Sequence, residues 1–380
     1  MTKPLANALA GLAALAVAMG VGRFAFTPIM PMMLRDAGLT LASGAWLASA
    51  NYLGYLLGAL SAMAWRVRPE LAIRGGLLAI GLVTAAMGAS LPIAAWLLLR
   101  LVAGIASAWV LISVSAWSLE ALARFQRPVL GSVVFAGVGV GIAAAGLLCV
   151  GLNLFDQGST TAWYALGAAA LAVTVLIWPI FKSHAAPVAN AAQDDAGNFH
   201  WNGEAKRLVF CYGVFGFGYI IPATFLPVMA RNALPGLAAF DCSWPLFGLA
   251  AALSTLAVAP LARHMSNRRM WILSQCTMAS GMLLAALRPQ LSSILIAALC
   301  VGGTFMVITL LAMQEARHLA GRHAARLIAA MTAAFAIGQI IGPLTVRAAA
   351  GAASFSGGLT IAAILLIGST LALRKPKSNS

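Results

Sequence analysis

The sequence predicts an all-α polytopic membrane protein, and three observations support this fold class. Of the 380 residues, 62% are hydrophobic and 9% are charged, whereas soluble domains average about 25% charged residues. Apolar runs long enough to cross a bilayer recur along the chain. The Lys and Arg residues gather in every second connection between these runs.

Composition also excludes several other classes of protein. The net charge of +15 does not indicate nucleic-acid binding, because the basic residues occur in small groups without an interleaved aromatic face. The five cysteines form no CxxC pair and predict neither disulfides nor a metal site. The first apolar stretch exceeds a signal-peptide h-region, so we expect it to be a membrane span.

Twelve apolar runs are separated by charged or turn-rich breaks, and a spanning helix needs about 20 residues. Their approximate limits are 8–33, 44–64, 72–91, 93–118, 130–153, 161–181, 208–230, 244–262, 270–288, 291–313, 326–346 and 353–373. A long polar stretch divides these runs into six plus six. We therefore expect an N-terminal six-helix bundle in 1–183, a cytoplasmic linker in 184–206 and a C-terminal six-helix bundle in 207–380.

The basic residues predict the orientation of the spans. With the N-terminus in the cytoplasm, 18 of the 24 Lys and Arg residues fall in inside segments and four fall outside. The other two, Arg23 and Arg100, lie within spans. Because cytoplasmic loops carry the excess of basic residues, both termini are expected in the cytoplasm.

The two halves of the chain are related in sequence. At a shift of 196, five identities fall in a sixteen-residue window, including Arg35 with Arg231. Glu120 and Glu315, after the fourth and tenth spans, correspond at a shift of 195. Together these matches predict a duplicated six-helix unit with pseudo-symmetry.

Local motifs resemble the major facilitator superfamily. The segment 100–108 (RLVAGIASA) resembles the Arg…Gly signature of its fourth helix, and 261–269 (LARHMSNRR) resembles the second copy of its cytoplasmic loop motif. The first copy, 65–74 (WRVRPELAIR), lacks the usual Gly and Asp. More narrowly, 20–33 (GVGRFAFTPIMPMM) followed by 46–55 (WLASANYLGY) resembles the YbfB/YjiJ-type branch.

This resemblance implies the major facilitator fold, with spans 1, 4, 7 and 10 around a central path. It also implies a multi-pass protein of the bacterial inner membrane that works by rocker-switch alternating access. The glycines of the fifth span resemble a close-packing and gating face, but they lack the proline-containing motif of drug–proton antiporters.

Arg23 is a charge in the middle of the first apolar run, and no acidic residue is near it in sequence. A charge at mid-bilayer depth costs about 2.5–3.5 kcal/mol on insertion scales and usually faces a protein interior or a watery path. Because guanidinium can bind a carboxylate through two hydrogen bonds, one reading is a substrate anchor. The other is structural, in which Arg23 bonds carbonyls freed by Gly20, Gly22 or Pro28 in an irregular helix.

Three more polar residues lie within the first four spans. Asn51 and Tyr52, in the second span, either contact the substrate or hydrogen-bond to span 1 or span 11, a type of link worth about 0.6 kcal/mol. Arg100 either contacts the substrate or, as the resemblance implies, braces the first helix. All three are candidate substrate-binding residues.

The second half contributes three candidates of its own. The seventh span, rich in glycine, is expected to be broken or bent around Pro222, and it carries Tyr219 and Thr224. Tyr219 takes the place of Arg23 in the repeat, which predicts that the two face each other. Gln339, in the eleventh span, lies among small residues and either packs there or binds substrate.

A candidate cytoplasmic gate lies where the fourth and tenth spans end. Glu120 with Arg124, and Glu315 with Arg317, together with Arg263, resemble charge networks that close the inner side of a transporter. The alternative is solvated pairs, each worth about 0–1 kcal/mol.

The distribution of titratable groups narrows the function. All nine acidic residues lie in loops or helix ends, and all five histidines lie in cytoplasmic segments. The usual intramembrane proton relay is therefore not expected, although a proton can travel with an anionic substrate that itself titrates. No side-chain cluster typical of an enzyme, a cofactor site or a metal site occurs.

We therefore expect a secondary active transporter of a small organic solute, anionic or zwitterionic, acting as a monomer in the lipid bilayer. One alternative is an efflux transporter of hydrophobic drugs or biocides. Another is a membrane sensor that binds a solute without transporting it.

Overall fold

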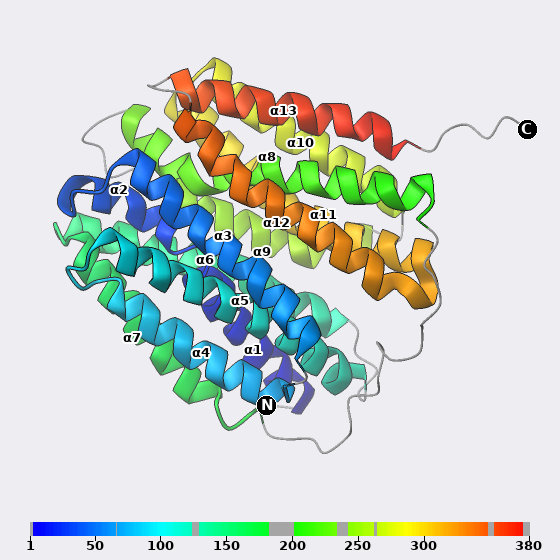
Figure 1. Cartoon of the computed structure of the whole chain (residues 1–380), viewed down its shortest axis with the longest axis horizontal. Helices are drawn as coiled ribbons and strands as arrows, with labels where there is room; N and C mark the ends of the chain where they lie inside the picture. Colours follow the sequence, from blue (N-terminus) through cyan, green and yellow to red (C-terminus); the bar gives the residue numbers. More distant parts are fainter. Residues whose placement is uncertain are drawn as a thin grey trace, which may run out of the picture.

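The computed structural model describes residues 3–65, 67–123, 129–181, 201–233, 242–261, 264–348 and 353–374. Within these ranges every regular element is a helix (Figure 1). In chain order the elements are α1 (Lys3–Leu15), the π-helix η1 (Ala16–Val21), α2 (Phe26–Asp36), α3 (Leu41–Ala64), α4 (Pro69–Ala86), α5 (Ile93–Ala123), α6 (Val129–Leu154), α7 (Ser159–Ile177), α8 (Gly203–Ala233), α9 (Ser243–Leu261), α10 (Asn267–Leu287), α11 (Leu291–Ala320), the 3-10 turn η3 (Gly321–His323), α12 (Ala324–Ala348) and α13 (Ala353–Leu373).

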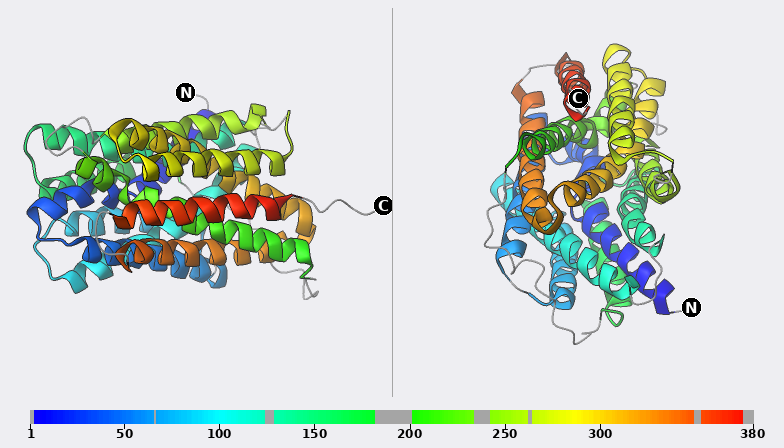
Figure 2. Two further views of the ribbon diagram at one scale, coloured as in Figure 1. Left: turned by 90° about the horizontal axis from the view of Figure 1, so that it is seen from above. Right: turned by 90° about the vertical axis from the view of Figure 1, so that its right-hand side faces the viewer.

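The helices run roughly along one common direction, as the two views in Figure 2 show. Each of the twelve predicted runs carries helix, the first as α1, η1 and α2 together and each later run as one helix from α3 to α13. Ten stretches of the described residues are long and apolar enough to cross a membrane. α3 is not among them, and α9 supplies a shorter apolar helix, Ser243–Val258.

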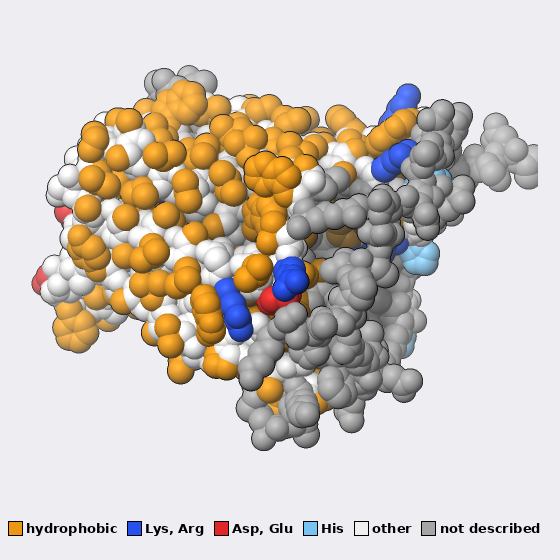
Figure 3. Space-filling view, turned by 60° about the horizontal axis from the view of Figure 1, so that its bottom comes forward, with side chains coloured by type: hydrophobic (Ala, Val, Ile, Leu, Met, Phe, Trp, Pro, Cys, Tyr) orange, Lys and Arg blue, Asp and Glu red, His pale blue; other side chains and the backbone are white. Residues whose placement is uncertain are grey.

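Apolar side chains cover much of the outside of the molecule. Hydrophobic side chains are spread across the part of the face in Figure 3 that is not grey. Leu98, Leu147, Leu176 and Leu287, from four different helices, are each more than 60% exposed. A surface of this kind is stable against lipid and unfavourable in water.

The first span is interrupted near its middle. In η1 the bonds from Gly22 N to Val17 O and from Phe24 N to Met19 O, each 3.0 Å, reach five residues back instead of four. A turn then follows before α2 begins at Phe26. The seventh span is not broken, because α8 runs as one continuous helix with Pro222 and Pro227 inside it, and a bend there stays a prediction.

Glycines allow α6 to cross its neighbours at very short range. A Cβ on Gly139 would lie 2.3 Å from the backbone N of Ala252 on α9, and one on Gly137 would lie 2.1 Å from Leu12 O on α1. The close packing predicted for the glycines of the fifth span is therefore confirmed, on two sides of α6 rather than on one face, and their role in gating stays a prediction. α6 against α9, α3 against α12 and α2 against α8 are the principal contacts between the two halves of the chain.

Burial along the first and seventh spans is uneven. Residues 17–33 and 218–230 are all buried, whereas several residues of 3–16 and 203–217 are partly exposed. Because α2 packs on α8, the later parts of these two spans cover each other. Arg23, Tyr219 and Thr224 lie within these fully buried segments.

Candidate functional site

Arg23 lies in the turn between η1 and α2, and only 2% of it is exposed. Its Nη2 donates a hydrogen bond to Oε1 of Gln339 on α12. Nε2 of Gln339 in turn donates to the hydroxyl of Tyr219 on α8. Guanidinium can only donate, so the amide oxygen of Gln339 must face it. Arg23 and Tyr219, which the repeat pairs, thus meet on the same buried amide.

Aromatic rings surround the Arg23 guanidinium. Its Cζ lies 3.8 Å from the ring centroid of Tyr55, 5.5 Å from that of Phe24 and 5.6 Å from that of Tyr52. Such ring faces attract a cation but do not neutralise it. Among the described residues no carboxylate pairs with Arg23, and its Nε has no hydrogen-bond partner.

Arg100 and Asn51 donate hydrogen bonds to main-chain carbonyls where the first span is interrupted. Nη2 of Arg100 donates to Arg23 O at 3.1 Å, and its Nη1 lies 3.5 Å from Gly22 O. Nδ2 of Asn51 donates to Gly22 O at 3.2 Å and to Arg100 O at 2.9 Å. These bonds are the bracing that one reading assigned to Arg23, whose own side chain points to α12 instead.

Two further residues of α5 make close contacts, Ser107 with the first span and Gly104 with α3. The hydroxyl oxygen of Ser107, on α5, lies 2.8 Å from Ala18 O and 2.7 Å from Ala103 O, so its single proton is shared between the two carbonyls. A Cβ on Gly104 would lie 2.1 Å from Asn51 O, so glycine is required where α5 meets α3. The Arg…Gly spacing of the fourth span therefore places a donor and a close approach one helical turn apart.

Tyr52 and Thr224 link α3 to α8 in the same layer. Their hydroxyl oxygens are 2.9 Å apart, and the Thr224 hydroxyl donates to Ile220 O at 2.7 Å. The Tyr52 hydroxyl is therefore the donor between the two. Nearby, Thr27 on α2 donates to Ala223 O at 2.9 Å. Thr27 and Ala223 are 196 positions apart, so equivalent positions of the repeat are in contact here.

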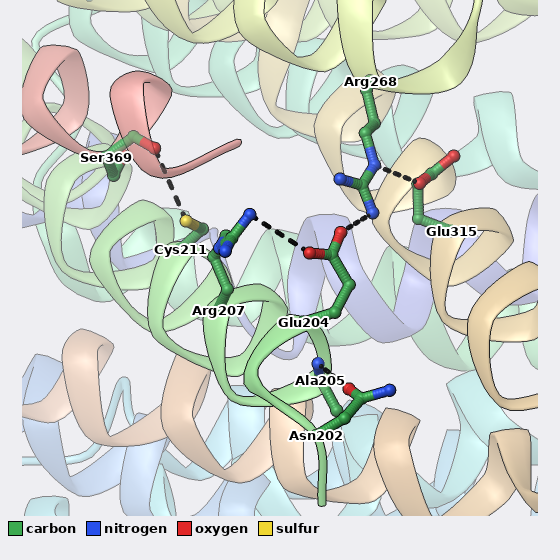
Figure 4. Close-up of polar contacts among 8 residues, drawn as sticks. All are labelled: Asn202, Glu204, Ala205, Arg207, Cys211, Arg268, Glu315 and Ser369. Carbon is green, nitrogen blue, oxygen red and sulfur yellow. Dashed lines mark hydrogen bonds and ion pairs between the residues drawn. The ribbon is translucent and has the colours of Figure 1, made fainter. Parts of the chain in front are cut away.

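One residue predicted for the cytoplasmic gate, Glu315, lies in a charge cluster whose other members were not predicted (Figure 4). Nε of Arg268 on α10 lies 2.7 Å from Oε2 of Glu315 on α11, and Arg268 also pairs with Glu204 on α8. Arg207 Nη1 lies 3.1 Å from Glu204 Oε2. Glu315 pairs with Arg268 in this cluster, and Arg317 is exposed on α11.

Other members of the predicted gate cannot be placed in this cluster. Arg124 and Arg263 lie outside the described residues, and Glu120 is described only through its place in the helix α5. The cluster in Figure 4 thus joins three helices of the second half.

Sequence reasoning missed several members of the site. Tyr55 is one helical turn beyond Asn51, and this spacing is a signal that it shares the same face. Thr27 stands next to the Arg23 segment, and its distance of 196 from Ala223 is the repeat shift itself. Arg268 lies inside the loop motif already identified, but nothing in the sequence gives its partners.

Comparisons with known proteins agree with this architecture. The crystal structure of the nucleoside transporter NupG is similar over 99% of this chain and 100% of that one, with a TM-score of 0.71 and 16% identity. A point mutant of that transporter covers 98% of this chain and 99% of its own, with a TM-score of 0.72 and 17% identity. At these identities the likeness shows the fold alone.

No protein among the curated ones matches the sequence. The model of one family does match, over residues 15–374, and its description is "Uncharacterised MFS-type transporter YbfB". This match spans almost the whole chain and agrees with the YbfB/YjiJ-type motifs of the first two spans. The chain therefore belongs to the YbfB-type family of major facilitator superfamily transporters.

Proposed function

We propose that this chain is a secondary active transporter that carries a small organic anion across the bacterial inner membrane, with Arg23 as the anchor of the substrate. Twelve spans form two six-helix bundles, 1–183 and 207–380, joined by the cytoplasmic linker 184–206. Both termini face the cytoplasm. Support comes from the transporter family, the fold likeness, the repeat and the bias of basic residues.

One observation carries the choice of an anion. Arg23 is buried, and the acceptor of its Nη2 is the neutral amide of Gln339. Guanidinium remains charged in proteins, and a buried charge without a counterion is costly. A carboxylate would give a charge-assisted, two-bonded partner, which is stronger than a bond to a neutral amide. An anion gains from this site, and a cation is repelled.

The contacts between the halves support rocker-switch alternating access. Thr27 with Ala223, Tyr52 with Thr224 and Arg23 with Gln339 all join first-half to second-half helices. Each is a single hydrogen bond, so the halves can exchange these partners during transport at modest cost. The fully buried segments 17–33 and 218–230 support a conformation that is closed on the outer side.

The proposal is tested by a thermal-shift screen of the purified protein, followed by flux measurements. The panel contains mono- and dicarboxylates, amino acids, sugars, nucleosides and cationic biocides. Carboxylates are expected to raise the melting temperature of the wild type but not of Arg23→Gln. Arg288→Gln, which removes an exposed arginine, serves as the matched control and should respond like the wild type.

Compounds that stabilise the protein are then tested for uptake into proteoliposomes, with and without a pH gradient. Uptake that depends on Arg23 supports the proposal. If the uptake also depends on the pH gradient, a proton is co-transported. Stabilisation by biocides alone, unaffected by Arg23→Gln, contradicts it in favour of efflux. Binding of a carboxylate without any flux contradicts it in favour of a sensor.

A further inference from the structure

We propose that the amide oxygen of Gln339 occupies the Arg23 guanidinium in the absence of substrate, and that the carboxylate of an aromatic monocarboxylate displaces it. This inference rests on the proposed function, in which Arg23 anchors an anion. When the carboxylate takes over Arg23, the hydrogen bond from α12 to the first span is released. Binding and the separation of the two halves are thereby coupled through one side chain.

The side chain of Gln339 is suited to be a partner of Arg23 that a substrate can displace. Its side chain is fully buried, accepts from Arg23 and donates to Tyr219. An amide oxygen satisfies one donor of the guanidinium but leaves the positive charge uncompensated. A glutamate of the same shape would neutralise Arg23 and hold it in an ion pair. Glutamine therefore keeps the cation positioned and still available to an external carboxylate.

The site offers one available cation, which favours a single carboxylate. The second buried arginine, Arg100, uses its two Nη groups for the carbonyls of Gly22 and Arg23 and lies over the ring of Phe26. A second carboxylate would need to break this backbone bracing. A dianion would therefore bind with one of its charges uncompensated.

Parallel rings beside Arg23 favour a flat apolar body. The Tyr219 ring is stacked on Phe305 at 5.7 Å between centroids and 2° between planes, and on Phe335 at 5.5 Å and 13°. Phe24, next to Arg23, contacts Phe305 at 6.3 Å. Aromatic rings add to such arrays in offset stacks. These rings come from three helices, α8, α11 and α12, and from the turn before α2.

The hydroxyl groups in this layer argue against a sugar as substrate. Tyr52 donates to Thr224, Thr224 donates to Ile220 O, and Thr27 donates to Ala223 O. The protons of these three hydroxyl groups are therefore already used within the protein. A polyhydroxylated ligand would have to replace these bonds one by one, whereas an aromatic acid needs only Arg23.

The test measures benzoate binding to the full-length protein in detergent by titration calorimetry, with uncharged benzamide as the matched probe. Gln339→Met keeps the length of the side chain and removes the competing oxygen. Gln339→Glu keeps the shape and adds a fixed carboxylate. The same two substitutions at Gln275, also fully buried but bonded to Ser369 and Leu366 O within the second half, are the controls.

The two variants are expected to change benzoate affinity in opposite directions. Hydrogen bonds to charged groups are strong enough that removing the competitor in Gln339→Met should tighten benzoate binding by about tenfold. The internal ion pair in Gln339→Glu should weaken it by about tenfold or more. The Gln275 variants should bind like the wild type, and benzamide should bind weakly to every variant.

Weaker benzoate binding in Gln339→Met would overturn the inference, because Gln339 would then be part of the surface that binds substrate. Equal binding of benzamide would also overturn it. If benzoate does not bind but another anion binds in an Arg23-dependent way, the inference fails and the proposed function stands. If no anion depends on Arg23, the proposed function fails.

Folding of each variant is checked by its melting temperature and elution profile. Should Gln339→Met not fold, Gln339→Asn keeps the amide and shortens its reach to Arg23. The same tightening of benzoate binding is then expected, and its absence in this folded variant counts against the inference.

Discussion

Replacing Gly104 by alanine tests how the fourth span holds the candidate site. The added methyl group would lie 2.1 Å from Asn51 O and 2.8 Å from Tyr55 N. Both are backbone atoms of α3 and cannot rotate away. Because ordinary contacts of this kind begin at 3.4 Å, α3 and α5 must separate by roughly 1 Å in a tightly packed core.

This separation should cost both stability and function. Overpacking of a well-packed core typically costs about 1–3 kcal/mol. The bond from Asn51 Nδ2 to Arg100 O, now 2.9 Å, would exceed hydrogen-bonding distance after a shift of roughly 1 Å. We expect Gly104→Ala to lower the melting temperature in detergent and to reduce carboxylate uptake into proteoliposomes.

Gly368→Ala provides the matched control. A Cβ at this position of α13 meets nothing within 4 Å, and alanine favours a helix over glycine by about 1 kcal/mol. Its melting temperature should equal or exceed that of the wild type. If Gly104→Ala proves as stable and as active as Gly368→Ala, the account of the α3–α5 contact is refuted.

Two other substitutions test the bracing and the cytoplasmic cluster. Asn51→Leu removes the donor to two main-chain carbonyls, each costing about 1–3 kcal/mol if left unsatisfied. Asn51→Leu should lower the melting temperature and should weaken carboxylate binding less than Arg23→Gln does. A loss of affinity as large as that of Arg23→Gln would contradict a purely bracing role for Asn51. Arg268→Gln leaves the carboxylates of Glu204 and Glu315 close together without their shared cation. Arg268→Gln should lower the melting temperature more at low salt than at high salt. An equal fall in melting temperature at both salt concentrations would contradict a stabilising role for the ion pairs of Arg268.

The elements and part of the site could be predicted from local sequence. Each apolar run is long enough to form a helix, and basic residues mark every second connection. The repeat also carried spatial information, since a shift of 196 relates Arg23 to Tyr219 and Thr27 to Ala223. Thr27 and Ala223 are bonded directly, and Arg23 and Tyr219 are joined through Gln339.

The remaining features depend on packing between distant segments. Asn51 and Arg100 donate to the carbonyls of Gly22 and Arg23 in the turn after the π-helix, and Ser107 lies within hydrogen-bonding distance of Ala18 O inside it. No local pattern predicts such a set. Arg100 braces the first span because α5 packs directly against it. Gln339 is 316 residues from Arg23, and only the docking of α12 brings the two side chains together.

Uptake of a labelled carboxylate by Arg23 variants tests the central claim most directly. The probe is the carboxylate that most stabilises the wild type, and the proteins are reconstituted in proteoliposomes at equal amounts. Uptake should fall to background in Arg23→Gln, remain partial in Arg23→Lys, whose point charge lacks the guanidinium fork, and stay at the wild-type level in Arg288→Gln. Uptake by Arg23→Gln at the wild-type rate would contradict the claim that Arg23 anchors the substrate.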